Sequence, residues 1–324
     1  MKKGIALILF LTMSILGYLQ LDGATDRATM YLEEGISQKQ AIESLEQEEE
    51  QEKKIPAVFF EKTVATDLEA DILNICGEAR LLTFGMATLT SEDVKGCLIS
   101  EALATKLFKS SKVIGNQVLL EDNEYIVRGV YAGANLQLIR LNQDDKLLFN
   151  QVRVLRQEHE MAATTLQTFA QRHGLRGDIL QWTEYVGIVK GLLLLSLVLL
   201  AIKGWSWLQK VMQLLPWSWL KKEFVRKIFL IIYVSAGLIL LARQIDIPIE
   251  MIPAKWSDFA YWSEWFKSII QNLGNVLFLE KGGYEQRFLV FGVCSIVGSV
   301  GAIALVFPRG FLHKTLDNHP PRIV

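Results

Sequence analysis

The residue patterns that enzymes use for catalysis are absent from this sequence. Its 324 residues contain no G-x-x-x-x-G-K-[ST] phosphate loop, no H-E-x-x-H zinc motif and no G-x-S-x-G nucleophile turn. His159 and His173 lie near no obvious nucleophile, while His313 and His319 lie in the C-terminal tail. We therefore expect no enzymatic activity, no cofactor and no metal site.

Three cysteines could supply a different kind of chemistry. Cys76 and Cys97 fall in the same polar region, but the chain contains no C-x-x-C motif. A disulfide between these two residues is one interpretation. Two buried free thiols are favoured, because sequence spacing does not decide disulfide geometry. Cys294 lies in an apolar run and is expected to be a small core residue.

The composition indicates a membrane protein with a sizeable water-exposed part. Hydrophobic residues make up 51% of the chain, and its mean hydropathy is +0.25. Both values are high for an ordinary soluble protein. The formal net charge is only −1, so the charge balance gives no reason to expect a nucleic-acid partner.

Apolar runs predict four transmembrane helices, at residues 1–21, 183–203, 228–245 and 288–307. The first run follows Lys2 and Lys3, and no good small-x-small cleavage site ends it. An uncleaved anchor is therefore favoured over a cleaved signal peptide. Trp182 and Tyr185 begin the second run, as residues of an aromatic belt would.

The last of the four runs carries small residues at three- and four-residue spacings, namely Ser295, Gly298, Ser299 and Ala302. Such a face allows two helix backbones to approach closely. We expect it to pack against another helix and not to line a pore.

The long polar region between the first and second runs is expected to hold one folded domain. Residues 22–54 predict an acidic helical linker, and residues 55–182 predict the domain itself. Apolar patterns in the domain predict strands at 58–60, 81–89, 136–141 and 147–155, and helices at 66–76 and 158–173. This irregular order indicates an α+β fold, inserted between the first and second of four transmembrane helices.

Within that domain, residues 97–130 predict a short helix, a glycine turn and a two-stranded hairpin. Ser100 can cap the helix, and Glu101 places negative charge in its first turn. Gly115 separates the helix from the hairpin. Asp122 and Asn123 are expected to form the tight turn, because both tolerate positive φ.

The distribution of lysine and arginine predicts a multi-pass topology with the N-terminus inside the cell. Residues 204–227 are rich in lysine and arginine and contain a single glutamate, Glu223, while the tail at 308–324 is also basic. Both are expected to be cytoplasmic. The α+β domain and residues 246–287 are then expected outside, on a bacterial cytoplasmic membrane.

Two loops could carry function. The inner loop, residues 204–227, is either a helix in the membrane interface or a docking helix for a cytoplasmic partner. Its candidate contact residues are Trp205, Trp207, Lys210, Trp217, Trp219, Lys221 and Lys222. The outer loop at 246–287 is rich in aromatic residues, and its candidate contact surface is Trp256, Trp262 and Trp265. A helix resting on the outer leaflet is favoured there, and a lid or contact surface is the alternative.

The segment around the hairpin resembles the periplasmic core domain of MacB-like and FtsX-like ABC transporter permeases. The matching positions are Ser100, Glu101, Ala104, Leu107, Phe108, Ile114, Gly115, Val118, Tyr125, Val127, Gly129 and Val130. In that family one helix, a large outer domain and three further helices follow one another. The resemblance implies a structural role for these motif positions.

The resemblance also implies partners. A separate ABC ATPase subunit would contact the inner loop, which makes docking as strong an interpretation as the interface helix. Membrane lipid and a second copy of the chain are further candidate partners. The expected function is export or mechanotransmission by a permease-type subunit. The alternative is a membrane-anchored sensor or scaffold, or a lipid- or peptide-binding protein, that works without an ATPase.

The sequence departs from the family in three respects. The ATPase domain fused in MacB is missing, so a separate subunit would be required. The outer domain is also shorter than in the large efflux members, and the aromatic outer loop is not part of the pattern.

Overall fold

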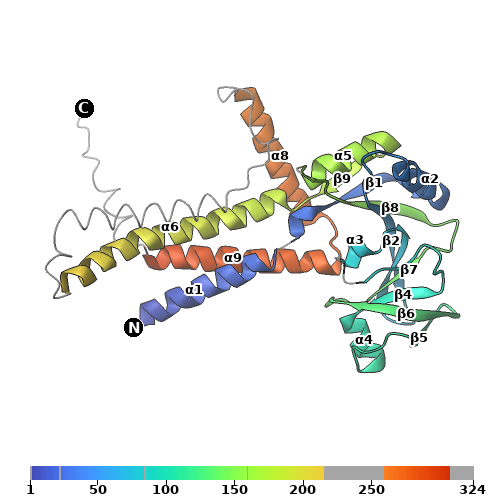
Figure 1. Cartoon of the computed structure of the whole chain (residues 1–324), viewed down its shortest axis with the longest axis horizontal. Helices are drawn as coiled ribbons and strands as arrows, with labels where there is room; N and C mark the ends of the chain where they lie inside the picture. Colours follow the sequence, from blue (N-terminus) through green and yellow to red (C-terminus); the bar gives the residue numbers. More distant parts are fainter. Residues whose placement is uncertain are drawn as a thin grey trace, which may run out of the picture. The chain divides into compact units, whose positions relative to one another are not determined.

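The computed structural model describes residues 2–21, 23–83, 85, 87–158, 160–214 and 259–306. The chain divides into two compact units. The sheet unit comprises Gly23–Glu184 and Pro253–Arg287. The helical unit comprises Met1–Asp22, Tyr185–Ile252 and Phe288–Val324 (Figure 1).

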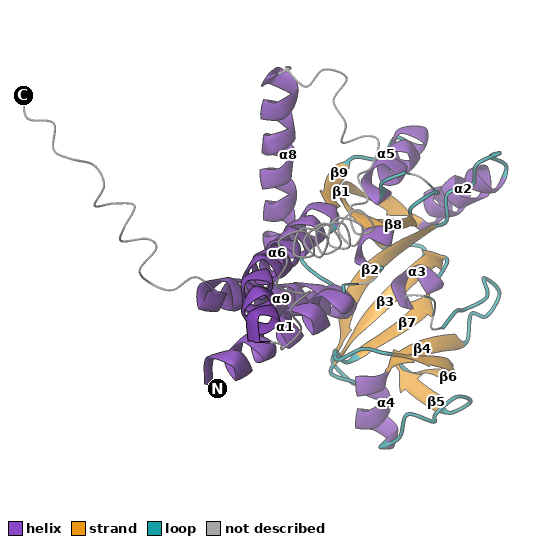
Figure 2. Cartoon of the chain, turned by 60° about the vertical axis from the view of Figure 1, so that its left-hand side comes forward, coloured by secondary structure: helices purple, strands orange, loops and turns teal. Residues whose placement is uncertain are grey.

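The sheet unit is built on one mixed sheet of nine strands (Figure 2). The strands are β1 Arg27–Ser37, β2 Ala57–Ala65, β3 Ala70–Gly77, β4 Gly96–Ser100, β5 Gln117–Leu120, β6 Asn123–Tyr131, β7 Gln137–Leu141, β8 Leu148–Leu155 and β9 Gly177–Leu180. Their order across the sheet is β5-β6-β4-β7-β3-β2-β8-β1-β9. The pairs β3–β7 and β4–β6 are parallel, and the remaining pairs are antiparallel.

Helices of the sheet unit lie against or beside this sheet. They are η1 Ala24–Asp26, α2 Gln38–Glu49, α3 Arg80–Thr83, α4 Glu101–Phe108, α5 Ala162–His173 and α8 Phe259–Phe278. Ser37 begins α2 with a capping box that it forms with Gln40. Gly174 ends α5 in the left-handed region, at φ +67°.

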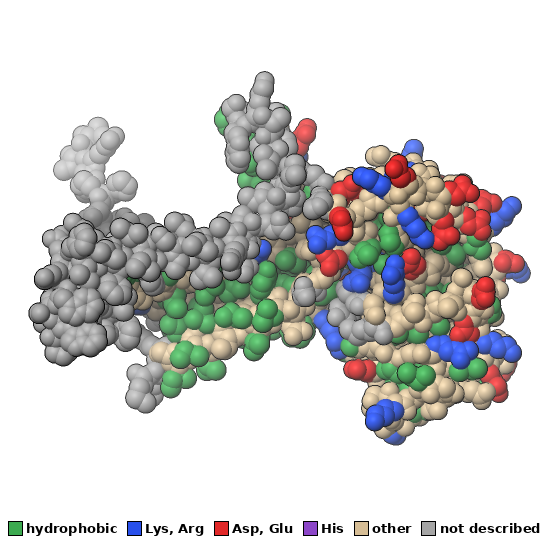
Figure 3. Space-filling view, viewed as in Figure 1, with side chains coloured by type: hydrophobic (Ala, Val, Ile, Leu, Met, Phe, Trp, Pro, Cys, Tyr) green, Lys and Arg blue, Asp and Glu red, His purple; other side chains and the backbone are tan. Residues whose placement is uncertain are grey.

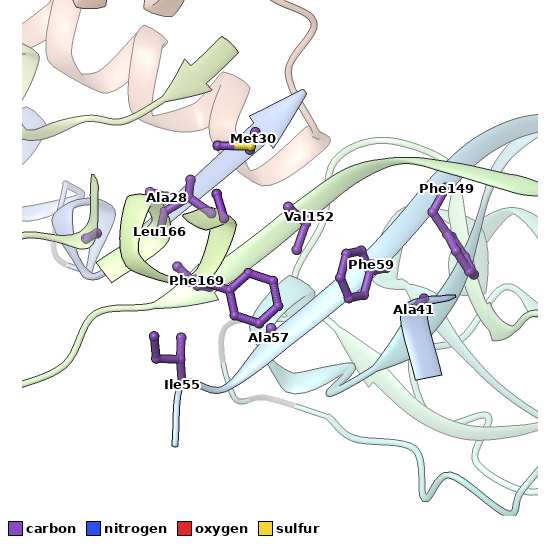
Figure 4. Packing of buried hydrophobic residues seen from close by; sticks show 13 residues of the cluster. Ala28, Met30, Ala41, Ile55, Ala57, Phe59, Phe149, Val152, Leu166 and Phe169 are labelled. Carbon is purple, nitrogen blue, oxygen red and sulfur yellow. The ribbon is translucent and has the colours of Figure 1, made fainter. Parts of the chain in front are cut away.

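One buried cluster joins α5 to the sheet strands β1, β2 and β8 (Figure 4). Phe59, Phe149 and Phe169 are fully buried there. The rings of Phe59 and Phe169 lie 5.9 Å apart between centroids, in a tilted arrangement. Burial of such large apolar side chains is the main force that holds a helix on a sheet.

The acidic segment expected to be a helical linker is part of this fold. Residues 27–37 form β1, which pairs with both β8 and β9, and α2 follows it. Ala28 and Met30 pack into the core at a spacing of two, a period that its charged neighbours obscured. Glu48 of α2 is also not solvated, because it is 1% exposed and forms an ion pair with Arg172. The linker prediction for residues 22–54 was therefore wrong in its first half, and the folded unit begins before residue 55.

Two predicted elements inside the domain were also wrong. The expected helix at 66–76 is replaced by β3, in which Ile72, Leu73 and Ile75 are all buried. A central strand buried on both faces loses the alternation that marks strands in a sequence. The expected strand at 81–89 is replaced by the one-turn helix α3 and a connecting segment.

Other sequence predictions are confirmed. The expected strands at 136–141 and 147–155 match β7 and β8, and the expected helix at 158–173 matches α5 with a later start. Ser100 caps α4 by accepting a hydrogen bond from Leu103 N, with a distance of 3.1 Å. The hairpin turn lies one residue earlier than expected, because Glu121 and Asp122 adopt positive φ.

The helical unit contains α1 Lys2–Leu19 and most of α6 Thr183–Leu214 and α9 Gly283–Val306. In the described residues, three segments are long and apolar enough to cross a membrane: Gly4–Asp26, Thr183–Trp205 and Glu285–Val306. Hydrophobic side chains cover much of the described helix surface in this unit, whereas charged ones gather over the sheet unit (Figure 3). The predicted helix at 228–245 and the tail at 308–324 lie outside the described residues.

Close packing of α1 on α9 confirms the role expected for the small residues. Ser14 Oγ lies 2.6 Å from Ser299 Oγ, and Ser295 Oγ donates to Ser14 O at 2.8 Å. A Cβ atom added to Gly298 would lie only 2.6 Å from Phe10 O. Glycine and serine thus let the two backbones meet.

Trp182 and Tyr185 are not an exposed aromatic belt. Both side chains are buried, and Tyr185 donates a hydrogen bond to Leu289 O at 2.8 Å. The three cysteines are free thiols. Of the two that were expected to be buried, Cys97 is buried and Cys76 is half-buried.

Candidate functional site

The inner-loop candidates are only partly described. The helix α6 runs without interruption to Leu214, so Trp205, Trp207 and Lys210 lie on its last turns. This helix extends beyond the expected end of the second span at residue 203. The other candidates, Trp217, Trp219, Lys221 and Lys222, lie outside the described residues.

The family-motif positions have structural roles in the sheet unit. Ser100 Oγ donates to Asn135 O at 2.7 Å and accepts from Gln137 N at 3.2 Å. It thereby ties the start of α4 to the strand β7. Tyr125 Oη accepts a hydrogen bond from Arg140 at 2.8 Å.

The remaining motif residues contribute to the fold of the same segment, residues 97–130. Gly115 adopts φ +91°, and a Cβ on Gly129 would lie 2.9 Å from Ala87 Cβ. Leu107 and Phe108 are half-buried against the core, whereas Glu101 is exposed. This arrangement supports folding and offers no catalytic group.

The outer-loop tryptophans lie on α8. Trp262 and Trp265 are half-buried, and their rings contact each other edge to face with centroids 5.6 Å apart. Trp256 lies outside the described residues. The structure therefore brings two of the three predicted contact residues together.

One buried polar cluster of the sheet unit was not predicted from the sequence. Arg153 of β8 forms an ion pair with Glu285, in the first turn of α9, and each side chain is only 7% exposed. Arg153 Nε also donates to Thr29 Oγ1 at 2.9 Å. The guanidinium lies over the ring of Phe60, 5.4 Å from its centroid.

Glu285 is held on both of its carboxylate oxygens. Oε1 accepts from Arg153, and Oε2 accepts from the backbone N–H of Gly282 at 2.9 Å. The second bond satisfies an N–H group just before α9, where a carboxylate is also favoured by the helix dipole. The start of α9 is thus fixed to the middle of β8.

A second group of bonds fixes the segment just before α9. Lys62 forms ion pairs with Asp71 at 3.2 Å and with Glu280 at 2.8 Å. Partial burial opposes the charge of Lys62, but its bonds to Glu280 and Asp71 outweigh that effect and raise its pKa. Tyr31 Oη donates to Glu280 O, and burial raises the pKa of Tyr31, so the phenol keeps its proton.

The cavity beside these bonds is small. Its volume is about 40 Å³, and it is lined by residues that include Tyr31, Lys62, Arg153 and Glu285. A space of this size is enough for water molecules. We call the bonds of Arg153, Lys62 and Tyr31 to residues 280–285 the α9 joint, because they fasten the start of a helix.

A similar joint holds the start of α6. Glu184, in the first turn of that helix, accepts hydrogen bonds from Asn272 of α8 at 2.8 Å and from Gln181 at 3.0 Å. Asn275 donates to Ile179 O in β9 at 2.9 Å. We call the contacts of Glu184 the α6 joint. Glu184 and Glu285 both belong to the sheet unit, and the helices that begin beside them continue into the helical unit.

Comparison with known proteins finds similar solved structures, two of which are described here. No family model and no curated protein matches the chain. The first structure is the periplasmic region of MacB from Actinobacillus actinomycetemcomitans, with 14% identity and a TM-score of 0.38 over 50% of this chain and 94% of that one. The second is the extracellular domain of the noncanonic ABC-type transporter YknZ from Gram-positive bacteria, with 14% identity and a TM-score of 0.33 over 47% of this chain and 96% of that one.

Proposed function

We propose that this chain is a permease-type subunit of a bacterial ABC transporter system that transmits motion to its extracytoplasmic sheet unit. A separate ATPase would act beneath the inner loop. Its closing and opening would shift α6 and α9, and the two joints would carry that shift into the sheet. The work is mechanical, whether it serves export or the control of an enzyme outside the membrane.

The observation that carries this proposal is the pair of joints. Glu184 and Glu285 occupy the first turns of two helices that are long and apolar enough to span a membrane. Both carboxylates are bonded to residues of the sheet unit. If a flexible linker joined such a helix to the sheet, a displacement of the helix would not move the sheet. A buried and hydrogen-bonded joint makes the sheet move with the helix.

The topology that goes with this function places the N-terminus in the cytoplasm and the sheet unit outside. Charge supports it, because the lysines and arginines of residues 204–227 are then cytoplasmic. The expected partners are an ATPase subunit, membrane lipid and a second copy of the chain. No cofactor is part of the proposal.

Copurification tests the partner. The chain is purified from its native membrane with a mild detergent, and an ABC ATPase subunit is expected in the complex. The variant Lys221→Glu/Lys222→Glu reverses charge in the inner loop and is expected to release most of that ATPase. The matched control Lys95→Glu/Lys112→Glu reverses two exposed charges of the sheet unit and is expected to retain it.

The alternative is a membrane-anchored sensor, scaffold or ligand-binding protein that uses no ATPase. It predicts that no ATPase copurifies with the intact chain. It also predicts that deletion of residues 205–222 leaves ATP turnover in the membrane unchanged. Either result would count against the permease proposal.

A further inference from the structure

The helix α8 carries an exposed apolar face that nothing in the described residues covers. Phe259, Phe266, Ile270 and Leu277 are 85%, 58%, 70% and 61% exposed. They are spaced by seven, four and seven residues, which places them on one side of a helix. Trp262 falls on the same side. This stripe runs along most of the length of α8.

Another side of α8, about 120° around the helix from the stripe, already has its partners in the sheet unit. Asn272 bonds to Glu184 and Asn275 bonds to the backbone of β9, while Val276 is 1% exposed. Figure 1 shows the C-terminal end of α8 beside β9 and its N-terminal end projecting away from the sheet. These contacts orient the helix, so that its apolar stripe faces away from the sheet.

The same contacts hold α8 next to the residues where two candidate spans begin. Asn272 bonds to the first turn of α6, whose span starts at Thr183. The C-terminal end of α8 lies only a few residues before the span that starts at Glu285. Lys281 holds that connection, because its ammonium donates to Leu279 O at 2.7 Å and to Leu277 O at 3.2 Å.

We propose that α8 lies in the membrane interface on the side of the sheet unit, with its apolar stripe in the lipid. The inference rests on the proposed membrane location of the chain and adds a lipid contact outside the spans. An amphipathic helix of this kind buries its apolar face at the boundary of headgroups and acyl chains. Because Asn272 connects it to Glu184, such a helix links the lipid surface to the α6 joint.

Protein partners could cover the same stripe, and they give different results in a depth measurement. Residues 215–258 of this chain, or a second copy, would shield the stripe from water without exposing it to lipid. A free stripe would stay in water. The bilayer is favoured because both fixed points of α8 adjoin the starts of spans, where lipid is within reach.

Spin-label depth measurements test the proposal in the full chain reconstituted into lipid vesicles. The background carries Cys76→Ala, Cys97→Ala and Cys294→Ala. A nitroxide is placed at Phe266 or Ile270 on the stripe, and at Glu264 or Gln271 on the polar side as matched controls. Collision with oxygen, which is soluble in lipid, is compared with collision with a water-soluble nickel chelate. Val297 of α9 is 51% exposed and serves as the reference for the span.

We expect labels at 266 and 270 to collide mainly with oxygen, as at 297, and labels at 264 and 271 to collide mainly with nickel. Nickel access at 266 and 270 equal to that at 271, with 297 still in lipid, would overturn the inference alone. Protection of 266 and 270 from both reagents would also overturn it, in favour of a protein contact. If a label at 297 collides mainly with nickel, the result contradicts the proposed membrane location of the chain itself.

Discussion

Arg153 is the residue on which the α9 joint depends. Its guanidinium N–H groups donate hydrogen bonds to Glu285 and Thr29, and its planar face packs over the ring of Phe60. A buried ion pair adds little stability over an apolar replacement, but the loss of one partner leaves an uncompensated charge. The pair therefore fixes the position of α9 more than it strengthens the fold.

Substitution of one partner at a time should expose this asymmetry. Arg153→Met and Glu285→Gln are each expected to lower the free energy of unfolding by about 3 kcal/mol or more. The double variant Arg153→Met/Glu285→Met is expected to lose clearly less than the sum of the two single losses. Chemical denaturation of the full chain in detergent micelles measures these differences.

An exposed pair supplies the control. Arg128 bonds to Asp93 with its side chain 45% exposed, so Arg128→Met is expected to lower the free energy of unfolding far less than Arg153→Met does. Equal losses for Arg153→Met and Arg128→Met, or strictly additive losses in the double variant, would show that the α9 joint is not energetically coupled.

The buried thiols give a second residue-level prediction. Burial raises the pKa of Cys76 to about 11, and burial together with the nearby charge of Asp93 raises that of Cys97 to about 12. At pH 8, about a thousandth of the Cys76 side chains, and a smaller fraction of Cys97, are then in the reactive thiolate form. This fraction rises about tenfold with each pH unit. In a Cys294→Ser chain, iodoacetamide is expected to alkylate both slowly until the protein is unfolded. Alkylation in the folded state as fast as that of an added Lys112→Cys thiol would contradict this assignment.

At the scale of elements, the sequence predicted α5 from its one buried face. The helical spacing of Leu166 and Phe169 was sufficient, because this helix packs one side on the core. The strand β7 was predicted from its apolar residues, although Leu138 and Ile139 are buried in two different clusters. The strand β3 is buried on both faces, so the spacing of its apolar residues resembles that of a helix. The strand β1 is short of apolar residues, since only part of it contributes to the core.

The joints could not be predicted in the same way. Arg153 and Glu285 are 132 positions apart in the chain, and each is an ordinary charged residue in its local sequence. The available signal was a lone arginine between Val152 and Val154 in a strand, together with a glutamate three residues before an apolar run. Only the folded sheet brings these two signals together.

Packing of α1 on α9 gives a prediction for elements. Gly298→Leu should separate the two helices, because even a Cβ atom there meets the backbone of Phe10. We expect a fall in melting temperature of several degrees in detergent. Gly187→Leu on α6 is the matched control, since a Cβ at that position has nothing within 4 Å. A similar melting temperature for both variants would contradict the close helix contact.

At the scale of the whole molecule, we propose transmission of motion and not passage of a substrate. The cavity at the α9 joint is only about 40 Å³, and the described faces of α1 and α9 pack on each other through small side chains. The sheet unit is instead tied to the first turns of α6 and α9. A displacement of either helix along its axis would therefore act directly on β8, β9 or α8.

The most direct test of this account is a distance measurement across the joints. Spin labels are placed at the exposed residues Leu119, in the sheet unit, and Val297, on α9, in membranes that contain the copurifying ATPase. We expect ATP to leave this separation nearly unchanged in the parent chain, because the joint makes α9 and the sheet move together. We expect Arg153→Met/Glu285→Met to make the separation ATP-dependent while ATP hydrolysis continues. A large ATP-dependent change in the parent chain, or none in the double variant, would contradict transmission through the α9 joint.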